Sequence, residues 1–532
     1  MTTPLLKQPS PLESLGLYQR QGRLGTALVS TAAGFVVALS LIPLLYLLIR
    51  AGEKPVSEIA GLLFRAKTFE VLATTSLLVV MVILLTSFFG VLIAAGLHFL
   101  ELSNKAWLII PAVLPLAIPS YVFTYTWIAF VPAFTGFFAA VFILFLTTLP
   151  YVTLACLAGL TRVDASQIEV ARSLGFSYPK TFFKVVLPQI RTYLSGGLLL
   201  AGLYTMSDFG AVSLLNVDTL TVTIQNMYRA SYDRTAAAVI SLVLITLSAI
   251  FVIADERVRR KQQKGEVIKS TSIKYALIEK NSYQVTTILL ITTYALLAVL
   301  IPVYVLLSRF FTNTVEISWQ QLIQASLSTI SVALLGAGIA LVLSIPLGIL
   351  LSERSTSFSR VSSRVILIGH ALPGVVVGLA LVSFGSKLGP LYQSTFLLAF
   401  AYALLFLAKS VASMRASLKQ VPTGAKEVAA TLGLNKWLVL KNVVTPIAAP
   451  GITLGAVLVF LTAMKELPAT LMLRPTGFET LATQIWSYAA INRFNEAAPY
   501  ALILIVMAAI PTFILSRPDR SDRGSINSGL GN

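Results

Sequence analysis

Two acidic side chains, Asp208 and Glu466, each directly follow a long apolar run. Ionisable groups near membrane depth are costly, so they usually face a cavity or a partner. Hard cations favour carboxylate and phenolate oxygens as ligands, and Tyr121 and Tyr204 are the phenols that we expect beside the two acids. The pattern predicts the outer mouth of a pathway that attracts a trivalent cation. The alternative is that the acids pair with basic groups such as Lys465 and fix loop structure.

The sequence contains no constellation of residues that predicts catalysis. ATP hydrolysis needs a glycine-rich phosphate cradle that ends in Gly-Lys-Ser/Thr, and the chain has no Gly-Lys dipeptide. Only two histidines are present, His98 and His370, and the single cysteine, Cys156, lies inside an apolar run. We therefore expect no enzyme activity, no catalytic residue and no cofactor in this chain. ATP and Mg²⁺ are expected on a separate polypeptide.

The elements that must position the two acids are apolar helices. Of the 532 residues, 56% are hydrophobic and 12% are charged, whereas roughly 25% are charged in soluble domains. The apolar residues come in runs of about twenty, the length that crosses ~30 Å of hydrocarbon. The sequence predicts an all-α polytopic membrane protein with about twelve transmembrane helices, at 27–49, 71–99, 106–130, 135–160, 192–214, 235–254, 286–308, 326–351, 365–384, 396–413, 448–464 and 499–516.

Basic residues divide unevenly between the loops. With the N-terminus in the cytoplasm and alternating spans, the inside segments hold 28 lysines and arginines and the outside segments hold 9. Such a bias sets orientation, so we expect both termini in the cytoplasm. The same bias accounts for the net charge of +18 without a nucleic-acid partner. The basic run at 257–261 is expected to lie against anionic lipid.

A short polar stretch between apolar runs occurs twice, at 169–175 and at 427–433. The copies read Glu-Val-Ala-Arg-Ser-Leu-Gly and Glu-Val-Ala-Ala-Thr-Leu-Gly, and a proline (Pro188 or Pro446) follows each glycine by thirteen residues. The copies lie at an offset of 258 in residue number, and we expect this offset to hold without a gap from residue 90 to residue 214. The further matches at this offset are Gly90 with Gly348, Leu114-Pro115 with Leu372-Pro373, Asp208 with Glu466, and Ala211 with Ala469.

The repeat predicts two six-helix halves in tandem. We place the first half at 27–254 and the second at 286–516, with a basic linker at 255–285. The flanking segments, 1–26 and 517–532, are expected to be cytoplasmic. Because six is even, both halves enter the membrane in the same sense, which gives parallel pseudo-two-fold symmetry about the membrane normal. A pathway on that axis would be lined by equivalent residues from both halves.

Each copy of the polar stretch predicts a helix, a sharp turn and a second helix on the cytoplasmic face. Ala171 and Ala429 are small enough to let another surface approach closely. Gly175 and Gly433 permit the left-handed turn that ends a helix. This shape suits docking into a groove on a cytoplasmic partner, and the alternative is a pair of interfacial anchors. Side-chain caps are available at both helix starts: Asp164 and Ser166 in the first copy, and Thr423 in the second.

Glycine pairs four residues apart, Gly374/Gly378 and Gly451/Gly455, permit close helix crossings. We interpret them as packing sites. If such a crossing lies on the pseudo-two-fold axis, it can also form a gate.

The spacing Glu-x-Ala-x3-Gly-x12-Pro resembles the EAA loop of type I ABC importer permeases, although valine replaces the middle alanine of that name in both copies, at Val170 and Val428. The resemblance covers nearly the whole chain and is closest to the fused, double-repeat permeases for ferric iron. The segments that carry this closer match are 118–122, 207–210, 371–378, 465–470 and 473–482.

The resemblance implies the permease subunit of an ABC importer in the inner membrane, which moves ferric iron inward by alternating access. The implied partners are two copies of a cytoplasmic ATP-binding subunit, a periplasmic substrate-binding protein and the lipid bilayer. Thiamine, polyamine and sulfate permeases share the loop, so these solutes are alternatives. An ion-gradient-driven secondary transporter leaves the repeated loop unexplained. The residues implied in ATPase docking are Glu169, Ala171, Gly175, Glu427, Ala429 and Gly433.

Overall fold

A computed structural model describes residues 11–100, 105–229, 234–263, 281–312, 317–353, 356–370, 372–387 and 389–516. Every extended regular element in these ranges is a helix, as the apolar composition predicts. The tail at 517–532 and most of the predicted linker, 264–280, lie outside the described residues.

Nine helices in the described ranges are long and apolar enough to cross a bilayer, and two bent helix pairs bring the number to eleven. The predicted span 192–214 corresponds to α9 (Leu187–Ser207), which is not among them and which ends at Asp208. The nine are contained in α1 (Pro11–Ala51), α3 (Ala66–Phe99), α6 (Phe137–Leu160), α12 (Arg234–Gln263), α13 to α14 (Asn281–Phe311), α15 (Trp319–Glu353), α18 (Thr395–Gln420), α20 to α21 (Lys436–Ala463) and α24 (Phe494–Ser516).

The predicted spans 106–130 and 365–384 are not straight helices. α4 with η1 (Lys105–Ala117) meets α5 (Ser120–Phe130) at 99°, and α16 (Ser357–His370) meets α17 (Gly374–Gly385) at the same angle. A proline with extended backbone begins the second helix of each pair: Pro119 has φ −65° and ψ 152°, and Pro373 has φ −64° and ψ 152°. Because this ψ lies far from helical values, the chain changes direction at both prolines.

The offset between the halves is not constant, which corrects the gap-free repeat. The predicted offset holds for α7 (Ala165–Ser173) and α19 (Thr423–Thr431). Helices α15 and α17, however, begin several positions earlier than this offset from α3 and α5 would place them, and α23 (Leu481–Ala489) begins later than the same offset from α11 (Leu220–Arg229) would place it. Extra residues between α17 and α18 account for the first change.

Two matches predicted at offset 258 are therefore wrong. Pro373 is the structural counterpart of Pro119, not of Pro115, because these two prolines occupy the same helix start. Gly90 and Gly348 are not equivalent either, because α3 and α15, which contain them, also differ from the predicted offset. A matched pair of hydrogen bonds supports the shorter offset between α3 and α15. The Thr75 hydroxyl of α3 accepts from the Leu220 amide (3.0 Å), and the Thr329 hydroxyl of α15 accepts from the Leu481 amide (2.9 Å).

Three helices widen to one π-helical turn, at η2 (Phe182–Val186), η3 (Leu296–Leu300) and η5 (Leu440–Val444). Each turn ends two residues before a proline: Pro188, Pro302 or Pro446. A proline inside a helix removes one amide donor, and its ring clashes with the carbonyl of the preceding turn. The wider turn accommodates the ring, so the helix runs on without a sharp break.

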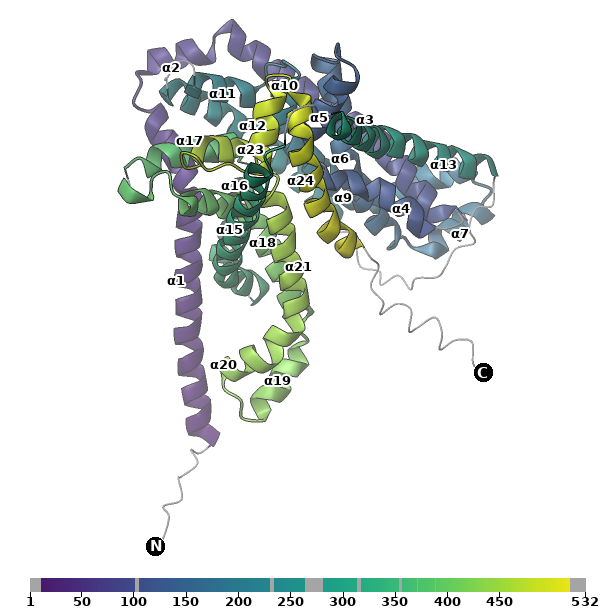
Figure 1. Cartoon of the computed structure of the whole chain (residues 1–532). Helices are drawn as coiled ribbons and strands as arrows, with labels where there is room; N and C mark the ends of the chain where they lie inside the picture. Colours follow the sequence, from purple (N-terminus) through teal and green to yellow (C-terminus); the bar gives the residue numbers. More distant parts are fainter. Residues whose placement is uncertain are drawn as a thin grey trace.

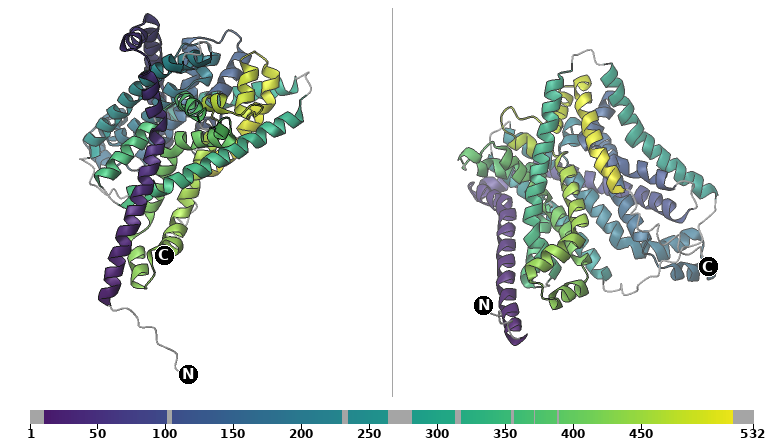
Figure 2. Two further views of the ribbon diagram at one scale, coloured as in Figure 1. Left: turned by 90° about the vertical axis from the view of Figure 1, so that its left-hand side faces the viewer. Right: turned by 60° about the horizontal axis from the view of Figure 1, so that its bottom comes forward.

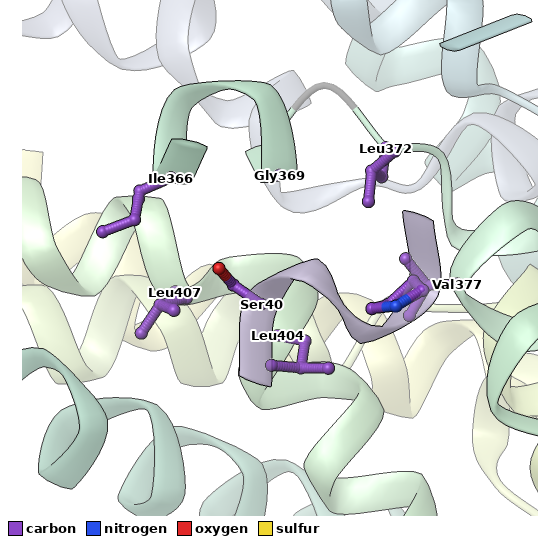
Figure 3. A pocket seen from close by; sticks show the side chains of 8 residues that line it. Ser40, Ile366, Gly369, Leu372, Val377, Leu404 and Leu407 are labelled. Atoms are coloured by element: carbon purple, nitrogen blue, oxygen red, sulfur yellow. The ribbon is translucent and has the colours of Figure 1, made fainter. Parts of the chain in front are cut away.

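The first helix of each half packs against the other half. Helix α1 lies along α15, α16 and α17 of the second half and also contacts α12 of its own half, and α13 (Asn281–Ala295) lies beside α3 and α4 (Figure 1, Figure 2). A crevice of about 10 Å³ marks the contact of α1 with the second half, and Figure 3 shows Ser40 of α1 there among Leu404, Leu407 and Ile366. This crevice is apolar and holds no more than one water molecule.

The two halves diverge toward one side of the molecule. In Figure 1, α6 and α9 run from the centre toward the lower right, whereas α18 and α21 (Thr445–Ala463) run downward. Helix α7 lies at the far end of the first set, and α19 lies at the far end of the second. The two copies of the polar stretch therefore stand at separate ends of the molecule, one on each half.

The glycine pairs are packing sites, as predicted. A Cβ at Gly378 would lie 3.0 Å from the sulfur of Met472, and a Cβ at Gly451 or Gly455 would collide with Ser417 or Ser413 of α18. All of these contacts lie within the second half. The close approaches thus tie α17 to α22 (Pro468–Leu473) and α18 to α21.

Candidate functional site

The two acids and the two phenols singled out from the sequence surround one pocket of about 160 Å³ between the halves. They are largely buried side chains and do not form an open rim: Asp208 is 8% exposed and Tyr121 is 3% exposed. Backbone breaks at the ends of α9 and α21, and at the bend before α5, bring these residues together. The polar residues that line the pocket are Ser120, Tyr121, Thr147, Tyr151, Tyr204, Ser207, Asp208, Lys409, Thr462, Lys465 and Glu466.

Both acids hold the start of a short helix. The Asp208 carboxylate accepts the Ala211 amide (3.0 Å) at α10 (Gly210–Leu214), and the Glu466 carboxylate accepts the Ala469 amide (3.1 Å) at α22. A carboxylate at a helix N-terminus satisfies an orphan amide and complements the helix dipole. The repeated acid–alanine spacing in the sequence is therefore the spacing of a helix cap.

The two carboxylates have different neighbours. In the first half, the Ser120 hydroxyl donates to Asp208. Gly374 occupies the position equivalent to Ser120, and a Cβ there would collide with the Glu466 carboxylate. The carboxylate of the longer glutamate thus takes the space that a serine side chain takes in the first half.

Two lysines face the same pocket, and their described partners are neutral. The Lys465 ammonium donates to the Leu116 carbonyl (2.7 Å) of the opposite half, and the Lys409 ammonium donates to the Thr462 hydroxyl (3.3 Å). Within the described chain, no ion pair joins either lysine to Asp208 or Glu466. The sequence-based alternative, a pair between Lys465 and one of these acids, is therefore absent from this part of the structure.

Lys409 was missed by the sequence analysis, although a signal was present. It lies inside the predicted span 396–413, four residues before its end, and is the one charged residue of that span. An ionisable residue inside a span usually faces a cavity or the interior of the helix bundle, and Lys409 lines the pocket. Its first-half equivalent is Tyr151, because α6 and α18 begin at the predicted offset from each other.

Three tyrosines place phenol oxygens, which are hard ligands, on one side of the pocket. The Tyr121 hydroxyl is buried and has no hydrogen-bond partner among the described residues, and the rings of Tyr151 and Tyr204 lie 6.0 Å apart. No three histidine, cysteine, aspartate or glutamate side chains converge anywhere in the ranges that the structure describes. A cation in this pocket would therefore depend on phenol oxygens as well as carboxylates.

The two copies of the polar stretch have the same backbone. Gly175 has φ +81° and Gly433 has φ +80°. In each copy the amide after the glycine donates to the alanine carbonyl five residues earlier: Phe176 to Ala171 (3.1 Å), and Leu434 to Ala429 (3.2 Å). These are the bonds of a glycine-terminated helix. The predicted sharp turn is confirmed in both copies.

The caps of these helices are described in one copy only. The Asp164 carboxylate accepts the Ser166 amide (3.0 Å) at the start of α7, as the sequence predicts. The side chain of Thr423, the predicted cap of the second copy, lies outside the described residues.

The two small alanines face the rest of the chain, not solvent. Ala171 and Ala429 are each 5% exposed, so the close approach that they permit is made by neighbouring segments of the same protein. Glu169 and Glu427 are exposed. The side chains that form the outer apolar face are Val170 and Leu174 in the first copy and Val428 and Leu432 in the second, all more than half exposed.

A family model and a known permease match this chain along most of its length, and two further relatives match shorter parts of it. Residues 35–264 and 344–517 match the family described as "Binding-protein-dependent transport system inner membrane component". The Fe(3+)-transport system permease protein FbpB 2 of Haemophilus influenzae is 31% identical over 483 residues, which cover 90% of this chain and 95% of the relative. Sulfate permease 2, chloroplastic, of Chlamydomonas reinhardtii is 28% identical over 42% of this chain and 65% of its own length. The phosphate transport system permease protein PstA 1 of Mycobacterium tuberculosis is 33% identical over 26% of this chain and 48% of its own length.

Proposed function

The chain belongs to the family of binding-protein-dependent transport system inner membrane components, and we propose that its cargo is ferric iron, which it moves inward by alternating access. It is the multi-pass permease subunit of an ABC importer, and it works with an ATPase and a substrate-binding protein. The observation that carries the iron assignment is the near full-length similarity to an Fe(3+) permease. The phenol and carboxylate oxygens of the pocket between the halves support it, because a trivalent cation favours such ligands.

Sulfate is the second candidate cargo. A sulfate permease is among the relatives, and Lys409 and Lys465 give the pocket two ammonium groups that suit an oxyanion. Sulfate has weaker support than iron, because the match to the sulfate permease covers less than half of this chain.

The proposed mechanism uses the duplicated loop as two docking sites for two ATPase subunits. Closure of the ATPase pair on ATP presses on α7 and α19, which stand at the diverging ends of the two halves. The halves then rotate, and the pocket between them changes the side to which it opens. The proposed mechanism places α7, α19 and both termini in the cytoplasm, and the bias in basic residues supports this orientation.

Reconstitution tests the cargo and the energy source together. Vesicles that contain this chain and its ATPase would receive binding protein loaded with radioactive ferric iron or with radioactive sulfate. We expect iron to enter only when ATP is present on the side of the ATPase, and sulfate not to enter. Uptake of sulfate without iron would replace the first assignment by the second. Uptake by the lone chain under an ion gradient, with no ATPase present, would overturn the importer mechanism.

A further inference from the structure

We propose that the pocket between the halves accepts its metal as a complex with an oxyanion, and that Lys409 and Lys465 bind the oxyanion. The chemical class meant is a phosphate or carboxylate group that coordinates the ferric ion. This inference rests on the proposed function, because it names the form in which the iron crosses. The two lysines are then specificity-determining residues of the permease.

The first observation is the state of the two ammonium groups. Each lines the pocket, and the hydrogen-bond partners that the described residues give them are neutral: a carbonyl of Leu116 and a hydroxyl of Thr462. Burying a charge is expensive unless an opposite charge accompanies it. An ammonium has three donors, so each lysine keeps two for a further acceptor. A cargo that carries an anionic oxygen supplies that acceptor.

The second observation is the state of the two acids. One oxygen of Asp208 accepts backbone amides and the other accepts the Ser120 hydroxyl. Glu466 likewise caps a helix with one oxygen. Part of their negative charge therefore stabilises the N-termini of two helices. With two lysines and two acids, the pocket has no excess negative charge to balance a bare trivalent ion, and the ammonium groups repel it.

The third observation is that the two halves contribute different chemistry to the same positions. Tyr151 of the first half is equivalent to Lys409 of the second, and Ser207 is equivalent to Lys465. Tyr121, whose buried hydroxyl has no partner in the described chain, adds a further phenol on the first-half side. The pocket therefore has a phenol side and an ammonium side. A two-part cargo, with a metal face and an anion face, matches this asymmetry.

A double-label experiment in the reconstituted vesicles tests the inference. The binding protein is loaded with radioactive iron in three arms, with radioactive phosphate, bicarbonate or citrate as the accompanying oxyanion. We expect one of the three anion labels to enter together with the iron, in a constant ratio and only with ATP. The arm in which this occurs identifies the source of the oxyanion.

Substitutions at the two lysines complete the test. Lys409→Met and Lys465→Met should each lower the entry of both labels by roughly tenfold or more, the effect of losing a hydrogen bond to a charged group. Lys409→Arg and Lys465→Arg keep the charge and should retain most of the uptake. Intact assembly with the ATPase, measured by size-exclusion chromatography, separates this effect from misfolding. Iron entry with none of the three anions, or methionine variants that transport at the wild-type rate, would overturn the inference and leave the iron assignment standing. Absence of iron uptake in the wild type would reject both.

Discussion

Asp208 and Glu466 differ by one methylene, yet each accepts the amide of an alanine three residues later. A second position compensates for this difference in side-chain length. It is Ser120 in the first half and Gly374 in the second. Serine fills the space beside the shorter acid and donates to it. Glycine leaves that space for the longer acid, because any Cβ there would meet the Glu466 carboxylate. The two positions therefore form a coupled pair in each half.

Exchanging the second-half pair for the first-half pair tests this coupling. Gly374→Ser alone should destabilise the protein by collision with Glu466, and Glu466→Asp alone should leave a gap beside the cap. The double variant recreates the pair that Ser120 and Asp208 form, so it should be more stable than the sum of the single effects predicts. Residues in contact show coupling energies of about 0.5–3 kcal/mol. Thermal unfolding of the four purified proteins measures the cycle, and simple additivity would contradict the coupling.

The charge of Asp208 can be separated from its role as a cap. Asparagine caps helices about as well as aspartate, whereas alanine costs about 1 kcal/mol. We expect Asp208→Asn to unfold at the wild-type temperature but to transport iron more slowly, because the carboxylate charge is lost from the pocket. Asp208→Ala should lose both stability and transport. If the asparagine variant transports at the full rate, the charge has no part in the pathway and the residue serves only as a cap.

Among the helices, the sequence predicts those features that residues close together in the chain determine. A carboxylate before a helix and a glycine after it define α7, so Asp164 and Gly175 are readable as cap and turn. The 99° bends are not readable in this way. The segment 105–130 contains Pro111, Pro115 and Pro119, and only Pro119 begins a new helix with extended backbone. The choice among the prolines depends on tertiary packing, because α5 is buried along most of its length.

The turns at Gly175 and Gly433 make a prediction about coupling. A Cβ added at either glycine would meet nothing within 4 Å, so this first side-chain carbon costs backbone strain only. The positive φ of both turns costs other residues about 1–2 kcal/mol each. The double variant Gly175→Val and Gly433→Val should therefore distort the docking loops, and ATP hydrolysis should continue while transport falls.

The matched control is Gly424→Val, at the start of α19. A Cβ there also meets nothing within 4 Å, but this glycine has no positive φ. It should transport normally in the same vesicles. Normal transport by the double valine variant, with normal stimulation of the ATPase by binding protein, would show that the turns do not transmit the movement.

At the scale of the whole molecule, the halves of the sequence are not the packing units of the structure. The predicted first half begins with α1, which packs on the second half, and the predicted second half begins with α13, which packs on the first. Two hydrogen bonds hold the α13–α14 segment there: the Tyr294 hydroxyl donates to the Leu146 carbonyl (2.8 Å), and the Arg309 guanidinium donates to the Ala129 carbonyl (2.8 Å). Hydropathy identifies such helices but not their neighbours, because lipid-facing and protein-facing surfaces are both apolar.

The exchanged helices predict that a chain cut in two will reassemble. If residues 1–270 and 271–532 are co-expressed, α1 and α13 each carry a packing surface for the other piece, and the bond from Lys465 to Leu116 adds a polar contact at the pocket. We expect an affinity tag on one piece to recover the other in equal amount from detergent. A first piece that lacks residues 27–51 should recover much less, since it loses the helix that lies along α15, α16 and α17. A first piece in which α1 is replaced by a polyleucine span of equal length controls for membrane insertion. Equal recovery by that control would mean that any apolar helix suffices and that the specific packing of α1, including Ser40 and its neighbours on α18, does not hold the halves together.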